Sequence, residues 1–374
     1  MASPILIFTT GFGEGHNSAA RGLSQALAEV GSETEVHDPL STCYPRLARR
    51  LQALYQLAIN QTPKLWERFY RWTDHRKYER AKFRQFRKAR RHIGDLLEDR
   101  SPAAVVTTYP FIAYLVDQAQ RSLPAGTHRV PRFTIITDSV SVNRIWLEAP
   151  SEYFLVAEPR TERVLLDHGI SPEKIRVFGF PVSPEFAALA SEGPTRHGND
   201  RPRRILYVAT SKSAPVRKIT GLLCADPDNE VTLVLGKHFE SLKEQAEEAR
   251  RSFPGRVEIV GWTERMPALM STHHVIVSKA GGATVHESLA ARTPMIIRNI
   301  VPGQEEGNAE LVLTERRGLL AETPEEIVEA VRMMFADEGA LWETFRSNIE
   351  QISRPRAALD IADFIREVCA KDAP

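Results

Sequence analysis

At 374 residues, with 42% hydrophobic and 26% charged residues, the chain is too long for one hydrophobic core and has a globular composition, which excludes fibrous and disordered proteins. Its apolar runs are as long as strands and too short to cross a bilayer. Its three cysteines show neither disulfide nor metal-ligand spacing, which predicts a reducing, cytoplasmic compartment. The net charge of +1 conceals a basic segment, residues 46–91, with fifteen Lys and Arg residues against three Asp and Glu.

The first half of the chain alternates short apolar runs with helical patterns. A strand over 5–9 is followed by a glycine-containing loop and a helix over 18–30. Further strands are predicted over 103–108, 133–137, 153–156 and 176–179. Strands that alternate with helices predict a parallel sheet with helices on both faces.

The alternation stops over 187–203, which is rich in turn residues, and then starts again. The second set of strands is predicted over 205–208, 231–235, 257–260, 274–277 and 295–297. We therefore predict an α/β chain of two doubly wound domains, 1–186 and 204–354, joined by a linker over 187–203. A helix over 355–370 could pack back on the first domain. Such folds bind ligands in a cleft at the carboxyl ends of their strands.

The first candidate site is the loop that contains Gly11, Gly13, Gly15 and His16, between a strand and a helix. Glycines allow a close approach of the backbone to a ligand, and a helix N-terminus favours anionic oxygen, so Gly13 and Gly15 are candidate donor-binding residues. A third glycine at dinucleotide spacing is missing. A tight turn with a capping histidine is the competing interpretation.

The second candidate site, residues 278–287, also follows a strand and opens a helix. N–H groups around Gly281, Gly282, Ala283 and Thr284 could hold a diphosphate against the helix dipole. Glu287, about one turn into the helix, could accept two hydrogen bonds from a ribose diol, although a Glu in an ordinary first turn is the alternative. The polar loop 302–310 that follows the next strand has amide and carboxylate groups suited to sugar hydroxyls.

The basic segment also contains aromatic residues at helical spacing. Trp66, Phe69 and Tyr70 fall on one helical face, with Arg68 and Arg71 beside them, which favours an interfacial helix on an anionic membrane. A solvated basic helix with its aromatics in the core is the alternative. Nucleic acid is not expected as a partner, because no known nucleic-acid module is visible.

Residues 278–297 and the motif PGQEEGN at 302–308 resemble the monogalactosyldiacylglycerol synthase family. That family includes processive diacylglycerol glucosyltransferases and belongs to glycosyltransferase family 28. GFGEGHNSAA at 11–20, the segment 133–138, Trp146 and the segment 174–182 resemble its N-terminal half. The resemblance covers nearly the whole chain and implies a GT-B fold.

The resemblance implies inverting transfer of a hexose from a UDP-sugar to a diacylglycerol-like lipid, without a bound metal or other cofactor. In that family the histidine of the first loop, here His16, is the proposed base, and a neutral imidazole with a pKa of about 6.5 suits that role. Asp138 is the next candidate base, and Trp146 lies on the acceptor side. The predicted donor contacts are Glu287 to ribose, Trp262 and Met266 to uracil, and Gln304, Glu305 and Asn308 to the sugar.

Two other functions are compatible with the same fold. A sugar-nucleotide sensor would need the donor half alone, whereas His16, Glu287 and Gln304 occur together here. A UDP-sugar epimerase would need no lipid surface and leaves the basic, aromatic segment without a role. We therefore expect a peripheral enzyme on the inner membrane face.

Overall fold

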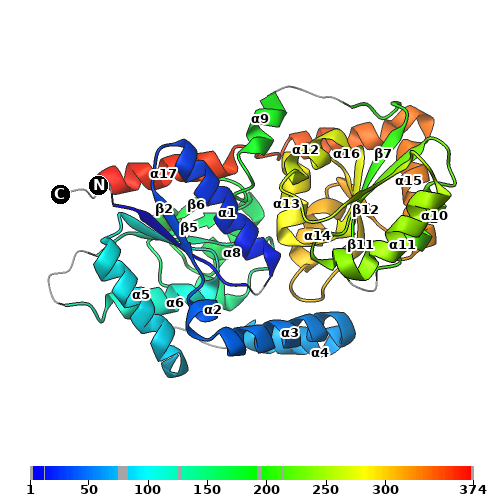
Figure 1. Cartoon of the computed structure of the whole chain (residues 1–374). Helices are drawn as coiled ribbons and strands as arrows, with labels where there is room; N and C mark the ends of the chain where they lie inside the picture. The colour runs from blue at the N-terminus through cyan, green and yellow to red at the C-terminus, as the bar shows by residue number, and fades with distance from the viewer. Residues whose placement is uncertain are drawn as a thin grey trace. The chain divides into compact units, whose positions relative to one another are not determined.

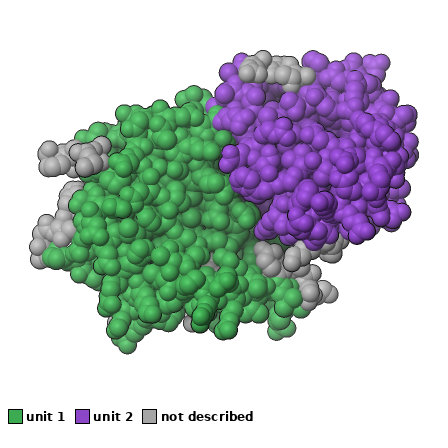
Figure 2. Space-filling model, in the orientation of Figure 1, with its two compact units in different colours: residues 1–184, 301–307, 356–374 green, residues 185–300, 308–355 purple. Residues whose placement is uncertain are grey.

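The computed structural model describes residues 3–11, 13–74, 83–124, 129–191, 196–211 and 214–371. The chain forms two compact units, coloured separately in Figure 2. Unit 1 consists of residues 1–184, 301–307 and 356–374, and unit 2 of residues 185–300 and 308–355. The loop 301–307 therefore belongs to unit 1, although it follows a strand of unit 2 in the sequence.

Unit 1 is built on a six-stranded parallel sheet in the order β2-β1-β3-β4-β5-β6 (Figure 1). The strands are β1 (Ile5–Phe8), β2 (Thr34–His37), β3 (Ala104–Thr107), β4 (Arg132–Ile135), β5 (Tyr153–Val156) and β6 (Ile175–Val177). The helices are α1 (Glu14–Glu29), α2 (Pro39–Cys43), α3 (Pro45–Gln61), α4 (Pro63–Asp74), α5 (Arg87–Arg100), α6 (Pro110–Gln120), α7 (Arg144–Leu147), α8 (Pro159–Asp167) and α17 (Ala357–Lys371).

Helices cover both faces of this sheet. All four residues of β1 are buried, as expected for a strand that is covered on both faces. On one face α1 and α17 pack together, and Leu23 and Ile361 are buried there. On the other face α5 and α6 contribute Ile93 and Ile112. The C-terminal helix thus completes the core of unit 1.

Unit 2 has a second six-stranded parallel sheet, in the order β12-β11-β10-β7-β8-β9. Its strands are β7 (Arg203–Val208), β8 (Asn229–Val234), β9 (Val257–Val260), β10 (Val275–Lys279), β11 (Met295–Asn299) and β12 (Gly318–Leu320). Its helices are α9 (Glu185–Ser191), α10 (Val216–Leu223), α11 (Phe239–Ser252), α12 (Met266–Thr272), α13 (Gly282–Ala290), α14 (Glu306–Leu313), α15 (Pro324–Phe335) and α16 (Ala340–Glu350), of which α14 has its first two residues in unit 1.

Two doubly wound sheets confirm the predicted fold class, and every predicted strand overlaps an observed one. The strands β2 and β12 were not predicted. Both lie at the edge of their sheet, β2 is only partly buried and β12 has three residues, so neither has a long apolar run. The segment 187–203 holds the end of α9 and the start of β7, and unit 2 begins at Glu185.

Candidate active site

The order of strands in unit 1 creates a switch point between β1 and β3. The chain leaves β1 for β2 on one side and returns to β3 on the other, so the loops after β1 and β3 diverge. Doubly wound folds bind ligands at such points, beyond the carboxyl ends of the strands. His16, in the first turn of α1, and Thr108, directly after β3, come from these two loops and touch each other.

The side chain of His16 is held in one tautomer. Its Nδ1 lies 2.8 Å from the carbonyl oxygen of Thr108 and 2.9 Å from Oγ1 of Thr137. A carbonyl can only accept, so we assign the proton to Nδ1, which donates to Thr108 and leaves a lone pair on Nε2. The ring packs edge-on against Tyr109, with centroids 4.8 Å apart, and 6.0 Å from the Trp146 ring. This arrangement presents Nε2 as a proton acceptor.

Burial lowers the pKa of His16 to about 4, against a smaller raising effect of the Thr108 hydrogen bond. The expectation of an unperturbed imidazole was therefore wrong. Transfer of the ring from water disfavours the imidazolium, so His16 is neutral at neutral pH but is a weaker base than a free histidine. Its charge state suits a general base, while its basicity is lower than predicted.

Asp138 and Trp146 form a pair just beyond the end of β4. Trp146 Nε1 donates to Asp138 Oδ2 over 2.8 Å, and Trp146 is 2% exposed. Burial raises the pKa of Asp138 to about 6, although the hydrogen bond from Trp146 lowers it. Asp138 is therefore a carboxylate whose basicity lies closer to neutrality than that of His16. Strongly shifted pKa values at the carboxyl edge of a sheet are typical of functional sites.

The glycine loop reaches helix α1 through a conformation that favours glycine. Gly13, the residue before α1, has φ of +119°, and Gly15 lies in the first turn of the helix. The N–H of Gly11 donates to Asp38 Oδ2 over 3.2 Å, and a Cβ at Gly11 would lie 2.4 Å from Gln52 Nε2. Helix α3, which carries Gln52, therefore packs against this loop.

Helices α3 and α4 lie side by side as a hairpin (Figure 1). Its inner face is aromatic: the rings of Tyr55 and Trp66 have centroids 5.1 Å apart, and Trp66 Nε1 and the Tyr70 hydroxyl are buried. Tyr55 donates to Gln304 Oε1 over 2.9 Å, which links α3 to the loop 301–307. Asn143 Nδ2 donates to Thr73 Oγ1 over 3.2 Å and so holds the end of α4.

The outer face of the hairpin is apolar and basic. Seven large apolar side chains are exposed, namely Leu47, Leu51, Leu54, Leu57, Leu65, Phe69 and Trp72. Arg68 and Arg71 are exposed on α4, and three further exposed arginines lie on α3. Of the three aromatics expected to face lipid, Phe69 is 50% exposed. Trp66 and Tyr70 turn inward, because residues 66 and 70 are one helical turn apart and share the face next to Tyr55.

Unit 2 has its own switch point, between β7 and β10. The chain leaves β10 through Ala280 and Gly281 and enters α13 at Gly282. Gly281 is the N-cap, and no side chain caps the helix, so backbone N–H groups of the first turn, including those of Ala283 and Thr284, point beyond it. Partly buried Glu287 follows on the same helix. The predicted diphosphate contacts therefore lie at the N-terminus of α13, and the predicted ribose contact lies further along the same helix.

The other predicted donor residues of unit 2 lie on neighbouring loops. Trp262 is 70% exposed in the loop after β9, and Met266 is the first residue of α12. An exposed indole is available to stack on a planar base. Asn308, 4% exposed in α14, donates from Nδ2 to the carbonyl of Ala280 over 3.2 Å. Asn308 thus supports the loop before α13.

In the loop 301–307 the two predicted sugar-reading residues differ. Glu305 is 5% exposed, and its Oε2 accepts the Val301 N–H over 3.1 Å, so this carboxylate closes the loop on itself. Gln304 is partly buried and accepts from Tyr55 through Oε1. Gln304 therefore has a nitrogen that can still face a ligand, whereas one oxygen of Glu305 is used within the loop.

Sequence reasoning assigned no role to Tyr55, Tyr109 or Thr137, which contact the candidate site residues. Burial raises the pKa of Tyr109 to about 12. The sequence could have indicated Tyr109, because this residue follows a buried strand, and residues after buried parallel strands lie at the edge of the sheet where site residues are found. Among the described residues, no helix is both long and apolar enough to span a membrane, and no cluster of three or more His, Cys, Asp or Glu could hold a metal.

Comparison with known proteins gives two family matches. The family described as monogalactosyldiacylglycerol (MGDG) synthase matches residues 16–182, and the glycosyltransferase family 28 C-terminal domain matches residues 210–348. The processive diacylglycerol beta-glucosyltransferase of Bacillus subtilis (strain 168) is 26% identical over 97% of this chain and 95% of its own length. The protein of the same name from Bacillus pumilus is 24% identical over 97% and 94%.

Solved structures share the fold at low sequence identity. MurG of Acinetobacter baumannii has a TM-score of 0.60 at 16% identity, covering 97% of this chain and 99% of its own. Os79 of O. sativa in complex with UDP has a TM-score of 0.65 at 12% identity, with 99% and 100% covered.

A UDP-GlcNAc 2-epimerase from Neisseria meningitidis reaches a TM-score of 0.60 at 14% identity, with 97% and 100% covered. Likeness of fold therefore does not separate transferases from epimerases. The two family matches do separate them: residues 16–182 belong to the monogalactosyldiacylglycerol synthase family, residues 210–348 are a glycosyltransferase family 28 C-terminal domain, and the chain has the GT-B fold.

Proposed function

We propose that the chain transfers a hexose from a UDP-sugar to a diacylglycerol-like lipid at an anionic membrane surface, with inversion at the anomeric carbon. The observation that carries this proposal is the two-sided hairpin α3–α4. Its outer face exposes leucines, Phe69 and Trp72 among arginines, and its inner face contacts the site through Tyr55 and Gln52. An acceptor that partitions from a bilayer would meet the site across this hairpin.

The proposed reaction is a displacement at the anomeric carbon of the sugar. The acceptor hydroxyl oxygen forms the new bond to that carbon, and UDP leaves with the electron pair of the broken bond. The acceptor proton goes to Nε2 of His16, whose tautomer leaves a lone pair there. Asp138, with a pKa of about 6, is the second group able to take this proton.

Donor binding in this proposal belongs chiefly to unit 2. The uncapped first turn of α13 at Gly281 and Gly282 would hold the diphosphate, and the helix dipole would stabilise charge on departing UDP. Glu287 would accept the ribose hydroxyls and Trp262 would stack on uracil. Because the helix end supplies this stabilisation, we propose that transfer needs no metal and survives chelation by EDTA.

Membrane binding in this proposal is peripheral and on the inner face. The three cysteines are free thiols, which is consistent with a reducing compartment. The exposed arginines of the hairpin would attract anionic headgroups at about 1 kcal/mol each near the surface. Phe69 and Trp72 would enter the headgroup region and add a hydrophobic contribution to membrane binding that salt does not screen.

The test is a transfer assay with purified full-length chain, one UDP-sugar at a time, and vesicles that contain diacylglycerol. We expect a new glycolipid by mass spectrometry with at least one UDP-sugar, with and without EDTA, and faster on anionic than on neutral vesicles. Binding of UDP-sugar without any product would instead identify a sensor, and a changed free sugar nucleotide would identify an epimerase.

Variants separate the membrane part from the donor part. Arg68→Gln with Arg71→Gln should weaken binding to anionic vesicles by about 2 kcal/mol, roughly 30-fold, and leave UDP affinity unchanged. Arg250→Gln with Arg251→Gln, on exposed positions of α11, is the matched control. Glu287→Ala should weaken UDP binding by about 1.5–3 kcal/mol without affecting vesicles. Equal vesicle binding by both arginine pairs would contradict the interfacial role of the hairpin.

A further inference from the structure

The hydrogen bond between Tyr55 and Gln304 joins residues 249 positions apart in sequence. Burial raises the pKa of the Tyr55 phenol, partly offset by this hydrogen bond, so the hydroxyl stays protonated and acts as the donor. The acceptor is Oε1 of Gln304, at 2.9 Å. The carbonyl end of the amide is therefore fixed on the hairpin.

A fixed carbonyl also fixes the nitrogen of the same amide. The Gln304 side chain has two N–H donors on Nε2, and no residue in the described part of the chain accepts from them. The free end of this amide can therefore donate but not accept. A hexose hydroxyl is a group that can accept such a bond. Without Tyr55 the amide could rotate and offer its oxygen instead.

The loop that carries Gln304 is packed tightly on both sides. Gly303 has φ of +79° and lies on the ring of Tyr70, so a Cβ there would be 2.9 Å from Tyr70 Cδ1. A Cβ at Gly307 would be 1.8 Å from the carbonyl oxygen of Ser139, next to Asp138. Both helices of the hairpin and the turn after β4 therefore hold the loop, and Tyr55 sets the amide within it.

We propose that Tyr55 is a positioning residue for the donor sugar, which acts through the amide of Gln304 and helps the enzyme to discriminate among UDP-hexoses. This inference rests on the proposed function, because it takes the UDP-sugar as the ligand. It adds a residue of the membrane-side hairpin to sugar recognition. The uridine and diphosphate contacts of the proposed function involve residues of unit 2 and should not depend on Tyr55.

The test compares the affinities of UDP, UDP-glucose and UDP-galactose by calorimetry for wild-type chain and Tyr55→Phe. Loss of one hydrogen bond should weaken the better UDP-hexose about 2- to 10-fold, leave UDP unchanged, and reduce the ratio between the two UDP-hexoses. Tyr44→Phe is the matched control, because its hydroxyl donates to Gln85 O and accepts from Lys88 N–H at the exposed start of α3. Its affinities should equal those of wild type.

A double-mutant cycle shows whether Tyr55 acts through Gln304. In the Gln304→Ala background, Tyr55→Phe should cause no further loss of UDP-hexose affinity, because the amide is absent. Additive losses, or a Tyr55→Phe protein with wild-type affinities, would overturn the inference and leave the proposed function intact. Failure of the wild-type chain to transfer any hexose would instead remove the proposed function. Thermal midpoints of all variants identify losses of affinity that are caused by unfolding. If Tyr55→Phe proves unfolded, the single variant Gln304→Ala must still reduce the ratio of the two UDP-hexose affinities.

Discussion

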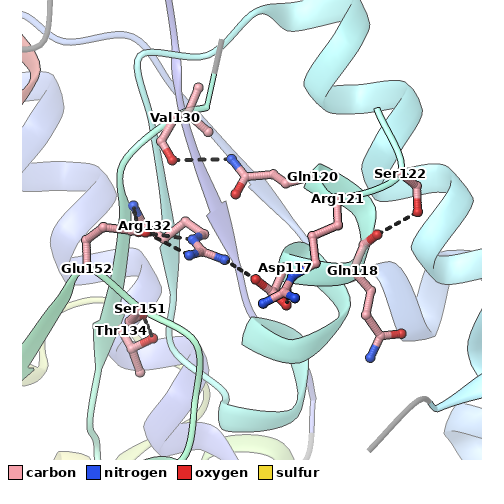
Figure 3. A network of polar contacts seen from close by, with 10 residues as sticks. All are labelled: Asp117, Gln118, Gln120, Arg121, Ser122, Val130, Arg132, Thr134, Ser151 and Glu152. Atoms are coloured by element: carbon pink, nitrogen blue, oxygen red, sulfur yellow. Dashed lines mark hydrogen bonds and ion pairs between the residues drawn. The ribbon is translucent and has the colours of Figure 1, made fainter. Parts of the chain in front are cut away.

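The two ends of strand β4 lie in different polar environments. At its amino end Arg132 is paired through all three guanidinium nitrogens: Nη1 donates to Asp117 Oδ1 over 2.6 Å, and Nε and Nη2 donate to the two oxygens of Glu152 over 3.0 and 2.7 Å (Figure 3). Just beyond its carboxyl end Asp138 is partly buried, and among the described residues its one hydrogen-bond donor is Trp146.

The comparison indicates that the amino edge of this sheet contributes stability, whereas its carboxyl edge carries the candidate catalytic groups. The charges around Arg132 neutralise each other, and the guanidinium is geometrically matched to Glu152, so this end ties α6 to β4 and β5. The opposite edge keeps a carboxyl group with a raised pKa and an imidazole with a lowered one, at an energetic cost to folding. Substitutions at the carboxyl edge should change catalysis, and substitutions at the amino edge should change stability alone.

The largest expected effect is that of His16→Gln. Glutamine can still donate to Thr108 O but cannot take a proton, so the single-turnover rate of transfer should fall by a factor of about 10² to 10⁴. UDP affinity should not change. The control is His37→Gln, which removes another histidine of unit 1, one that contacts Glu35 at 3.0 Å. A rate that survives His16→Gln would move the base to Asp138.

The second prediction concerns pH and Asp138→Asn. Burial raises the pKa of Asp138 from 3.8 to about 6, so the folded chain binds this proton more tightly than the unfolded chain does. The resulting stabilisation is present below pH 4 and is lost as pH rises through about 6. Between pH 4 and pH 7.5 the free energy of unfolding of the wild type should therefore fall by up to ~3 kcal/mol relative to that of Asp138→Asn.

Urea unfolding of both proteins across this pH range measures the effect. His16, whose lowered pKa gives the opposite trend, is present in both proteins and cancels in the difference. Asparagine keeps an oxygen that can accept from Trp146 Nε1, so the hydrogen bond is a smaller variable than the charge. Parallel stability curves for the two proteins would show that Asp138 has an ordinary pKa.

Much of this arrangement could be predicted from sequence, because buried parallel strands have continuous apolar runs and their following loops gather at one edge. That reasoning located the loops of His16 and Gly281 from local patterns, whereas Asp138 came from the resemblance to a family. It did not predict the low pKa of His16, because burial depends on Tyr109 and Trp146, which are far away in the sequence. The resemblance to a family identified Gln304, but nothing local to position 304 indicated its partner.

The hairpin shows a second limit of sequence reasoning. Helical periodicity placed Trp66, Phe69 and Tyr70 together, since they span only about 100° of a helix. Periodicity gives the angle between side chains but not which of them faces the protein. The partner helix decided this, because Tyr55 on α3 packs against Trp66 and leaves Phe69 and Trp72 outside.

The smallest expected effect belongs to the amino end of β4. Asp117→Asn removes the charge that pairs with Arg132 and, through Oδ2 at 2.9 Å, with Arg121. Arg132 and Asp117 are 17% and 14% exposed, so the loss should exceed that of a surface pair and reach about 1 kcal/mol in urea unfolding. Arg121→Gln, which removes a 68% exposed partner, should cost less than half of that. The transfer rate should equal that of wild type in both variants, because neither side chain lies at the carboxyl edge; a rate loss beyond twofold in a folded Asp117→Asn protein would mean that the two ends of β4 are coupled.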